Sequence, residues 1–189
     1  MDAFRTQEAE LFRTVVDINI SNGMTFDFLA YIFKRDDDTG FYKVSTTTIP
    51  GAAAAYLAMP AEHKFHLPEK KGFTPATLCL PWVEGTRSLA GKFAWYPPEC
   101  ELRINALLRD YIELDFFKYY LRGMEYGYQK QEIVEMYLIS RTMDPDKNWE
   151  ALHKRAYRKE MNTIKERMAI LQRKARYFFL EDDNNPPKK

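Results

Sequence analysis

Residues 147–180 read KNWEALHKRAYRKEMNTIKERMAILQRKARYFFL, and this stretch decides the fold that the sequence predicts. Its apolar residues recur at steps of four and three, the a/d spacing of a coiled coil, in which one narrow stripe packs against another helix. Most positions between them are polar, so we predict a long amphipathic helix. We call the stripe the helical seam. Its members are Tyr157, Met161, Ile164, Met168, Leu171, Ala175 and Phe178.

The same stretch is strongly basic. It holds ten Lys or Arg and three Glu, which gives it a net charge of +7. Because the whole chain carries only +1, the remainder carries −6. This asymmetry predicts either an acidic partner for the helix or a contact between the helix and the acidic rest of the chain.

A second long helix is predicted over residues 99–142. Pro97 and Pro98 suit its first turn, and Glu99 favours the positive end of the helix dipole. Apolar residues occur on more than one side, which indicates burial on more than one side. Gly123 and Gly127 lower helix propensity, and we expect them to allow close packing rather than a kink. The short turn before residue 147 then predicts a long antiparallel helical hairpin over residues 99–180.

The first 98 residues are predicted to be less regular. Residues 2–17 form an amphipathic helix in this prediction, and residues 24–34 and 41–49 form a small β-hairpin. A helix over 27–35 is the competing interpretation. Prolines and glycines interrupt residues 50–98 so often that only two helical turns at 52–59 and short strands at 77–80 and 92–96 fit. The many aromatic residues there favour a segment that wraps over a surface.

The predicted fold class is therefore mainly α, with α+β character. The predicted parts are residues 1–98, which hold the N-terminal helix, the hairpin and the irregular Pro/Gly-rich segment; residues 99–180, which hold the helical hairpin; and a polar tail, 181–189, whose composition is typical of disorder.

Two loops resemble ligand-binding motifs and fail on spacing. Gly85 and Gly91 are six residues apart rather than five, and Phe93 stands where a phosphate-binding loop carries a hydroxyl for magnesium. The acidic run at 36–38 has Gly40 one position early for a calcium loop, and Thr47 stands in place of the bidentate glutamate. We expect turns at both places.

No metal site is predicted. Glu62, His63 and His66 form the only histidine cluster, but prolines on both sides leave no helix long enough to present them, and no further ligand follows at a zinc-type spacing. Cys79 and Cys100 are 21 residues apart, which fits two reduced thiols in an intracellular protein. No cofactor is expected.

The expected location is a reducing compartment, the cytoplasm or the mitochondrion. The N-terminal residues lack the pattern of a secretory signal, so we do not expect secretion. No stretch approaches the ~20 apolar residues of a transmembrane helix, and peripheral contact with a membrane stays open.

These patterns predict a non-catalytic structural subunit. It would dock by its long amphipathic helices onto a large intracellular multiprotein complex, for example as an accessory subunit of an organellar respiratory or ATP synthase complex. No catalytic motif stands out, so no enzyme is predicted. The predicted partner-binding residues are Tyr157, Met161, Ile164, Met168, Leu171, Phe178, Arg158, Lys165 and Arg173.

Two alternatives remain at this level. The basic helix is also compatible with a nucleic-acid-binding protein, such as a ribosome-associated or viral protein. The spread of cations around the helix and the near-neutral whole chain count against it. The other alternative is a small enzyme with its site in residues 50–98, which would show a deep pocket lined by titratable groups.

Overall fold

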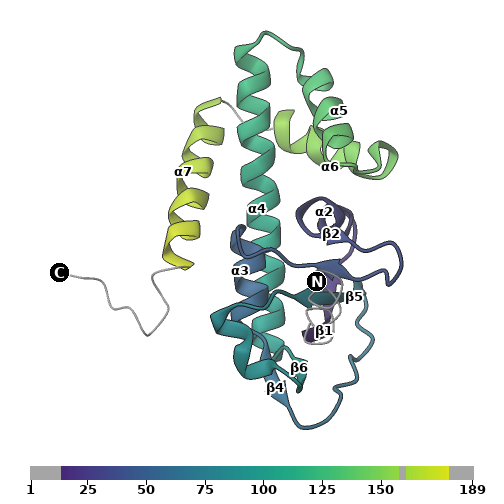
Figure 1. The fold of residues 1–189 in the computed structure, drawn as a ribbon. Helices are drawn as coiled ribbons and strands as arrows, with labels where there is room; N and C mark the ends of the chain where they lie inside the picture. The colour runs from purple at the N-terminus through teal and green to yellow at the C-terminus, as the bar shows by residue number, and fades with distance from the viewer. Residues whose placement is uncertain (1–13, 158–160, 179–189) are drawn as a thin grey trace, which may run out of the picture. The chain divides into compact units, whose positions relative to one another are not determined.

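The computed structural model describes residues 14–157 and 161–178, in which helices dominate beside small sheets of a few strands (Figure 1). The fold is broadly α+β, in agreement with the predicted class. The chain divides into two compact units, Met1–Leu108 and Arg109–Lys189. The boundary falls inside helix α4, Pro98–Glu125, which therefore contributes to both units.

Unit 1 contains a four-stranded sheet with the order β1-β5-β3-β2. Strand β1 (Thr14–Ser21) pairs antiparallel with β5 (Phe73–Leu80) along its whole length. The short strand β3 (Tyr42–Lys43) runs parallel to β5, and β2 (Lys34–Arg35) runs antiparallel to β3. The sheet thus joins segments that lie about 60 residues apart in the chain.

Strand β1 occupies the end of the segment for which an N-terminal helix was predicted. Residues 14–17 belong to the strand, so the prediction is wrong there; residues 2–13 lie outside the described residues. Val16, Ile18 and Ile20 alternate with other residues and are buried. An alternation of β-branched side chains suits a pleated strand with one covered face, and this local period overrides the helical one.

Residues 24–32, for which the first strand of a β-hairpin was predicted, form helix α2 (Met24–Ile32), so the prediction is wrong there. Its buried side chains are Thr25, Phe28, Leu29 and Ile32, which recur at helical steps of three and four. The competing helix over 27–35 is the nearer prediction. Across the polar loop, the two-residue strands β2 and β3 pair with each other.

The turn between β2 and β3 is organised by Asp36. Its carboxylate accepts hydrogen bonds from the N–H groups of Asp38 and Thr39, both at 3.2 Å, and forms an ion pair with Lys43. The hydrogen bond from Lys43 is the main cause that lowers the pKa of Asp36 to about 2. These contacts explain why the acidic residues 36–38 form a turn, as expected from the sequence.

A small helix and a separate ribbon complete the middle of unit 1. Helix α3 (Ile49–Tyr56) begins at Thr48, whose side chain accepts from the Gly51 N–H, and it buries four consecutive alanines. Strands β4 (Met59–Ala61) and β6 (Phe93–Trp95) pair antiparallel as a two-stranded sheet, with the 3₁₀ helix η1 (Glu84–Leu89) between β5 and β6 in the chain. Strands thus occur in both regions, 77–80 and 92–96, where short strands were predicted.

The first turns of α4 cover the free edge of β1. The Asn105 side chain accepts from the Ser21 N–H through Oδ1 and donates to the Asn19 carbonyl through Nδ2, both at 2.8 Å. Glu101 accepts from the Asn19 N–H at 3.2 Å. Side chains of the helix therefore satisfy backbone groups that an edge strand otherwise exposes.

Unit 2 consists of residues 109–125 of α4 followed by α5 (Lys130–Ser140), α6 (Pro145–Tyr157) and α7 (Met161–Phe178). The single helix predicted over 99–142 is wrong, because α4 ends at Glu125. Gly127 has a left-handed φ of 80°, and Gln129 and Glu132 cap the start of α5. The long antiparallel hairpin is thus not confirmed.

The two glycines of this region differ in role. Gly127 marks a break, against expectation. Gly123 permits close packing, as predicted, since an added Cβ would lie 2.7 Å from Cγ1 of Ile133. The helix predicted over 147–180 corresponds to α6 and α7. Residues 158–160 between them and the predicted tail 181–189 lie outside the described residues.

Candidate functional site

An apolar face is exposed on the ribbon of β4 and β6. The register pairs Met59 with Trp95 and Ala61 with Phe93. Directly opposed residues of an antiparallel pair project from the same side, so all four share one face. We call these four residues the ribbon face. Met59 is 49% exposed and Phe93 is 51% exposed, although both side chains are apolar.

Phe65 extends the ribbon face. Its ring lies 5.1 Å from the ring of Trp95, centroid to centroid, and is tilted by 36°. It remains 42% exposed in spite of this contact. Large apolar side chains that gather at an accessible surface are typical of interaction sites rather than of ordinary solvent-facing surface.

The ribbon rests on a tightly packed base. The opposite side of β6 carries Ala94, which is buried, and the hydroxyl of the next buried residue, Tyr96, donates to the Ala54 carbonyl at 2.6 Å. Burial raises the pKa of Tyr96, so the phenol keeps its proton and its role as donor. Tyr56 packs its ring over Gly85, where an added Cβ would lie 2.2 Å from the ring. The ribbon face is therefore presented by a fixed support.

The outer edge of the ribbon is poorly suited to a further strand. Pro60 stands at the centre of β4, opposite Ala94. Proline has no N–H to donate to a ladder, which is why it is tolerated at sheet edges. The ladder therefore lacks a backbone donor at the centre of β4, and the side chains of the ribbon face are the groups that this ribbon exposes.

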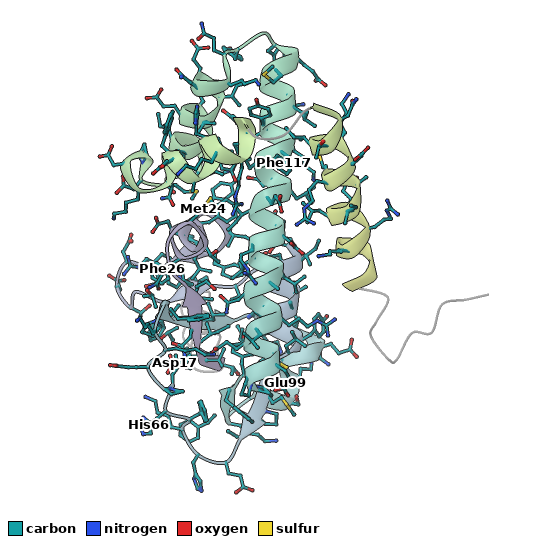
Figure 2. The ribbon with its side chains drawn as sticks, turned by 180° about the vertical axis from the view of Figure 1, so that it is seen from behind. Asp17, Met24, Phe26, His66, Glu99 and Phe117 are labelled. Atoms are coloured by element: carbon teal, nitrogen blue, oxygen red, sulfur yellow. The ribbon has the colours of Figure 1, made fainter. Side chains whose placement is uncertain are left out.

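Charged residues lie close in the chain to the exposed phenylalanines. Lys64 precedes Phe65 and Lys92 precedes Phe93; both lysines are exposed, and neither forms an ion pair with another described residue. Glu62 is the exposed acid nearest in the chain. His66 is exposed on the loop that follows β4, as Figure 2 shows. The histidine cluster of the sequence thus lies on the exposed segment that follows β4.

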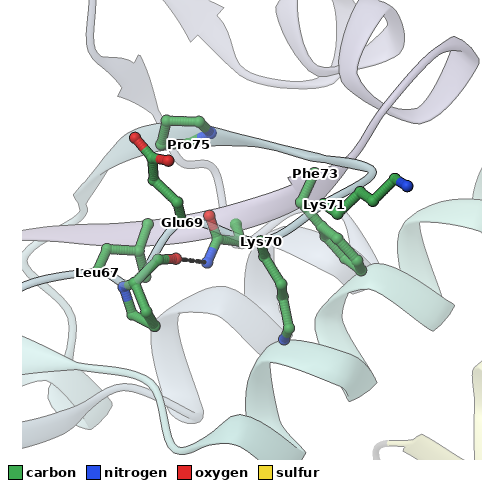
Figure 3. Close-up of a pocket in the computed structure, with 8 residues that line it drawn as sticks. Leu67, Glu69, Lys70, Lys71, Phe73 and Pro75 are labelled. Carbon is green, nitrogen blue, oxygen red and sulfur yellow. Dashed lines mark hydrogen bonds between the residues drawn. The ribbon is translucent and has the colours of Figure 1, made fainter.

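A cavity of about 440 Å³ opens nearby in unit 1 (Figure 3). Lys70 forms an ion pair with the largely buried Glu101 at 2.7 Å, and Asn19 donates to the Pro68 carbonyl at 3.1 Å. These contacts fasten the loop to β1 and α4, which is a structural role. The cavity is lined by Asn19, Leu67, Pro68, Glu69, Lys70, Lys71, Phe73 and Pro75.

The described part of the helical seam lies in the interior of unit 2. Ile164 is 1% exposed and Leu171 is 2% exposed, and Met168 between them is half-buried. Residues with this spacing point to one side of α7, as the sequence predicts. The side chains of Tyr157, Met161, Ala175 and Phe178 lie outside the described residues, as does all of Arg158.

The basic face of α7 contacts carboxylates of α4 within unit 2. Arg167 binds Glu113 at 2.8 Å and lies 3.7 Å from Asp110, and Lys174 lies 3.3 Å from Asp110. The hydrogen bond with Glu113 is the main cause that raises the pKa of Arg167. Of the two outcomes predicted from the charge asymmetry, the contact within the chain is thus observed. Lys165 and Arg173 remain exposed.

Other sequence candidates are placed as follows. Residues 85–91, the loop that resembles a phosphate-binding motif, lie in η1 and the turn after it. Cys79 and Cys100 are half-buried thiols, and burial raises the pKa of Cys100. Within residues 14–157 and 161–178, no group of three His, Cys, Asp or Glu is arranged to hold a metal ion. Among the described helices, none has the length and apolar character needed to cross a membrane.

The ribbon face was not identified from the sequence. Its only local signal is that residues 59–61 and 93–95 are short non-polar runs, and three residues are too few to establish a period. The two strands lie more than 30 residues apart, and only their pairing brings Met59 next to Trp95.

Comparison with known proteins gives no relative for this chain. No protein-family model matches it, and neither a curated protein nor a solved structure is significantly similar to it.

Proposed function

We propose that this chain is a non-catalytic structural subunit that docks onto a larger protein assembly through its ribbon face. The observation that supports this most is the half exposure of Met59 and Phe93 beside the exposed ring of Phe65. Methionine and aromatic residues are enriched at protein interfaces, where covering them removes apolar area from water.

The helical seam is less suited to docking than the ribbon face. Ile164 and Leu171 are already buried within unit 2, and Arg167 and Lys174 already face carboxylates. Docking through these residues requires α7 to leave α4, which exposes two apolar side chains and breaks the ion pairs. The ribbon face requires no such rearrangement.

Nucleic-acid binding by α7 is the second candidate. It is favoured by Lys165 and Arg173, which are exposed and form no ion pair with any residue in the described part of the chain. Among the described residues of α7 these two cations are available for phosphates, and charge-driven binding would weaken as the salt concentration rises.

The proposal is tested by purifying the tagged full chain from its native cells and quantifying the proteins that accompany it. The wild type is compared with Met59→Ser/Phe93→Ser and with Ile139→Ser, a control whose side chain is exposed on α5. We expect the ribbon variant to lose a specific set of proteins that the control retains. Equal recovery from all three proteins, or a wild type that purifies alone, would contradict the proposal.

The same purification distinguishes the second candidate. Binding of RNA or DNA that is lost with Lys165→Glu/Arg173→Glu and kept with the ribbon variant would assign the interaction to α7. We expect instead that Lys165→Glu/Arg173→Glu retains the accompanying proteins that the ribbon variant loses, because the docking surface proposed for this chain carries neither residue.

A further inference from the structure

We propose that Asn22 is a site of deamidation in the folded protein, and that the hydroxyl group of Thr74 promotes the reaction. This inference goes beyond the proposed function and does not depend on the ribbon face. It follows from three features of the turn between β1 and α2: the glycine after Asn22, the contact of the Asn22 side chain with Thr74, and the start of a helix directly after the turn.

The first feature is the pair formed by Asn22 and Gly23. It is the only Asn-Gly pair in the sequence, and both residues are exposed. Deamidation begins when the main-chain nitrogen of the following residue attacks the side-chain carbonyl carbon of the asparagine, and a side chain on that residue hinders the approach. Gly23 has no side chain, and beyond its chain neighbours no atom lies within 4 Å of the place that a Cβ would take. The attack on Asn22 is therefore unhindered at position 23.

The second feature is a hydrogen bond to the carbonyl group that reacts. The hydroxyl of Thr74 donates to Oδ1 of Asn22 at 2.6 Å, and the Asn22 N–H donates to the Gly72 carbonyl at 3.0 Å. Negative charge develops on Oδ1 when a nucleophile adds to Cγ, and a donor already aimed at that atom stabilises the charge. Thr74 thus lowers the barrier to the attack.

The third feature is the start of helix α2. Gly23 is the N-cap residue of this helix, and no side chain caps its first turn. The unpaired N–H groups and the positive end of the helix dipole favour negative charge at this place. Such charge occurs on the Gly23 nitrogen when it loses its proton, and later on the carboxylate of the product.

The reaction consumes water and needs no other reagent. The Gly23 nitrogen loses its proton to solvent and bonds to Cγ of Asn22, and the bond from Cγ to Nδ2 breaks. Ammonia leaves after Nδ2 takes a proton from solvent, and a succinimide ring remains. Water then adds to one of the two ring carbonyls: opening at Cγ gives aspartate, and opening at the main-chain carbonyl carbon gives isoaspartate.

The product changes the junction between β1 and α2. Both forms replace a neutral amide by a carboxylate next to the positive end of α2. Isoaspartate also adds a methylene group to the main chain directly after Ser21, the last residue of β1. Because the reaction needs only water, the modified fraction increases with the age of the folded chain.

The test follows the purified full chain during incubation at mildly alkaline pH in water enriched in heavy oxygen, with mass spectrometry of its tryptic peptides. We expect the peptide that contains Asn22 to take up heavy oxygen as aspartate and isoaspartate accumulate. Asn162, which is exposed on α7 and precedes a threonine, is the internal control and should remain an amide. No uptake at Asn22, or equal uptake at Asn162, would overturn the inference.

Variants of Thr74 test the role of its hydroxyl group. Thr74→Val removes the donor at nearly constant volume, and Thr74→Ser retains it. We expect the valine variant to deamidate about threefold to tenfold more slowly at Asn22, a smaller effect than in a buried oxyanion hole because water reaches this site. The serine variant should match the wild type. A valine variant as fast as the wild type, or a serine variant as slow as the valine variant, would overturn the role of Thr74.

The same incubation in concentrated urea separates the effect of the fold from that of the sequence. Thr74 and Asn22 lie far apart in the chain, and their hydrogen bond exists only in the folded protein. We therefore expect the wild type and both variants to deamidate at one common rate when unfolded. A difference between them that persists in urea would contradict the assignment to the hydrogen bond.

Discussion

Asn105 occupies the place that a neighbouring strand would take beside β1. Its amide oxygen accepts from the Ser21 N–H and its amide nitrogen donates to the Asn19 carbonyl, so it satisfies one donor and one acceptor that a neighbouring strand would otherwise pair. One side chain on a helix thereby blocks the edge of the longest described strand pair against pairing with other chains.

Replacing Asn105 tests this role. Asn105→Leu leaves a buried donor and a buried acceptor without a partner, so we expect the free energy of unfolding to fall by about 1–3 kcal/mol. Asn105→Asp should cost at least as much, because a carboxylate oxygen then faces the Asn19 carbonyl. Leu102→Gln on the exposed side of α4 is the control and should change stability by about 0.5 kcal/mol or less. Urea unfolding measures all three, and equal values would contradict the assignment.

Tyr96 makes stability sensitive to alkaline pH. Burial raises the pKa of Tyr96 in the folded protein, whereas a tyrosine in the unfolded chain titrates near pH 10. Below pH 10 both states hold the proton, so the contribution is complete there. Above it the unfolded chain loses the proton first, and the free energy of unfolding should fall by about 1.4 kcal/mol per pH unit from this residue.

Tyr96→Phe isolates that contribution. At pH 7 the variant should be less stable by about 1 kcal/mol, because the Ala54 carbonyl loses its donor. Between pH 9 and 11 it should lose stability less steeply than the wild type. Denaturant titrations across this range measure both slopes, and parallel curves would show that Tyr96 ionises in the folded protein.

At the scale of single elements, close packing between α4 and α5 depends on Gly123. A methyl group there would lie 2.7 Å from the buried side chain of Ile133. We expect Gly123→Ala to destabilise the protein by about 1–3 kcal/mol, although alanine is the better helix former. Adding Ile133→Val should recover part of the loss, and a double-mutant cycle measures this coupling. Additive effects would contradict the contact.

Leu171 is one of the buried side chains on the inward side of α7. Leu171→Ala removes a buried side chain, and we expect a loss of about 2–5 kcal/mol in the stability of this element. The adjacent Ile170, which is exposed, provides the control Ile170→Ala. Hydrogen exchange of α7 amides should accelerate in the first variant and stay unchanged in the second. If exchange accelerated in Ile170→Ala and not in Leu171→Ala, the side of α7 that carries Leu171 would not be the buried one.

Elements with a strong period were predictable from sequence. The spacing of Ile164, Met168 and Leu171 correctly identifies the inward side of α7, because long helices repeat their pattern over many turns. Strand β1 was missed, since Val15 and Val16 fit a helix as well as a strand until β5 supplies the partner. The end of α4 was missed because apolar residues continue past Gly127, and only the left-handed glycine and the Gln129–Glu132 cap reveal the break.

At the scale of the whole chain, the sequence identified the apolar stripe of α7 but did not identify the apolar surface that the structure exposes. The helical seam was predicted to meet a partner, yet its described residues Ile164 and Leu171 are buried within unit 2. The ribbon face depends on pairing between distant three-residue strands, which no local pattern encodes. The proposal therefore moves the docking surface from α7 to β4 and β6, while the predicted class of function stays a non-catalytic subunit.

Hydroxyl-radical footprinting of the full chain, alone and in the assembly recovered from its native cells, tests the docking surface most directly. Oxidation of Met59, Phe65 and Phe93 should fall severalfold in the assembly, because a partner covers them. Tyr126, the most exposed of the large apolar side chains described, provides the internal reference and should react equally in both samples. Unchanged oxidation of Met59 and Phe93 beside protection elsewhere in the chain would contradict the account.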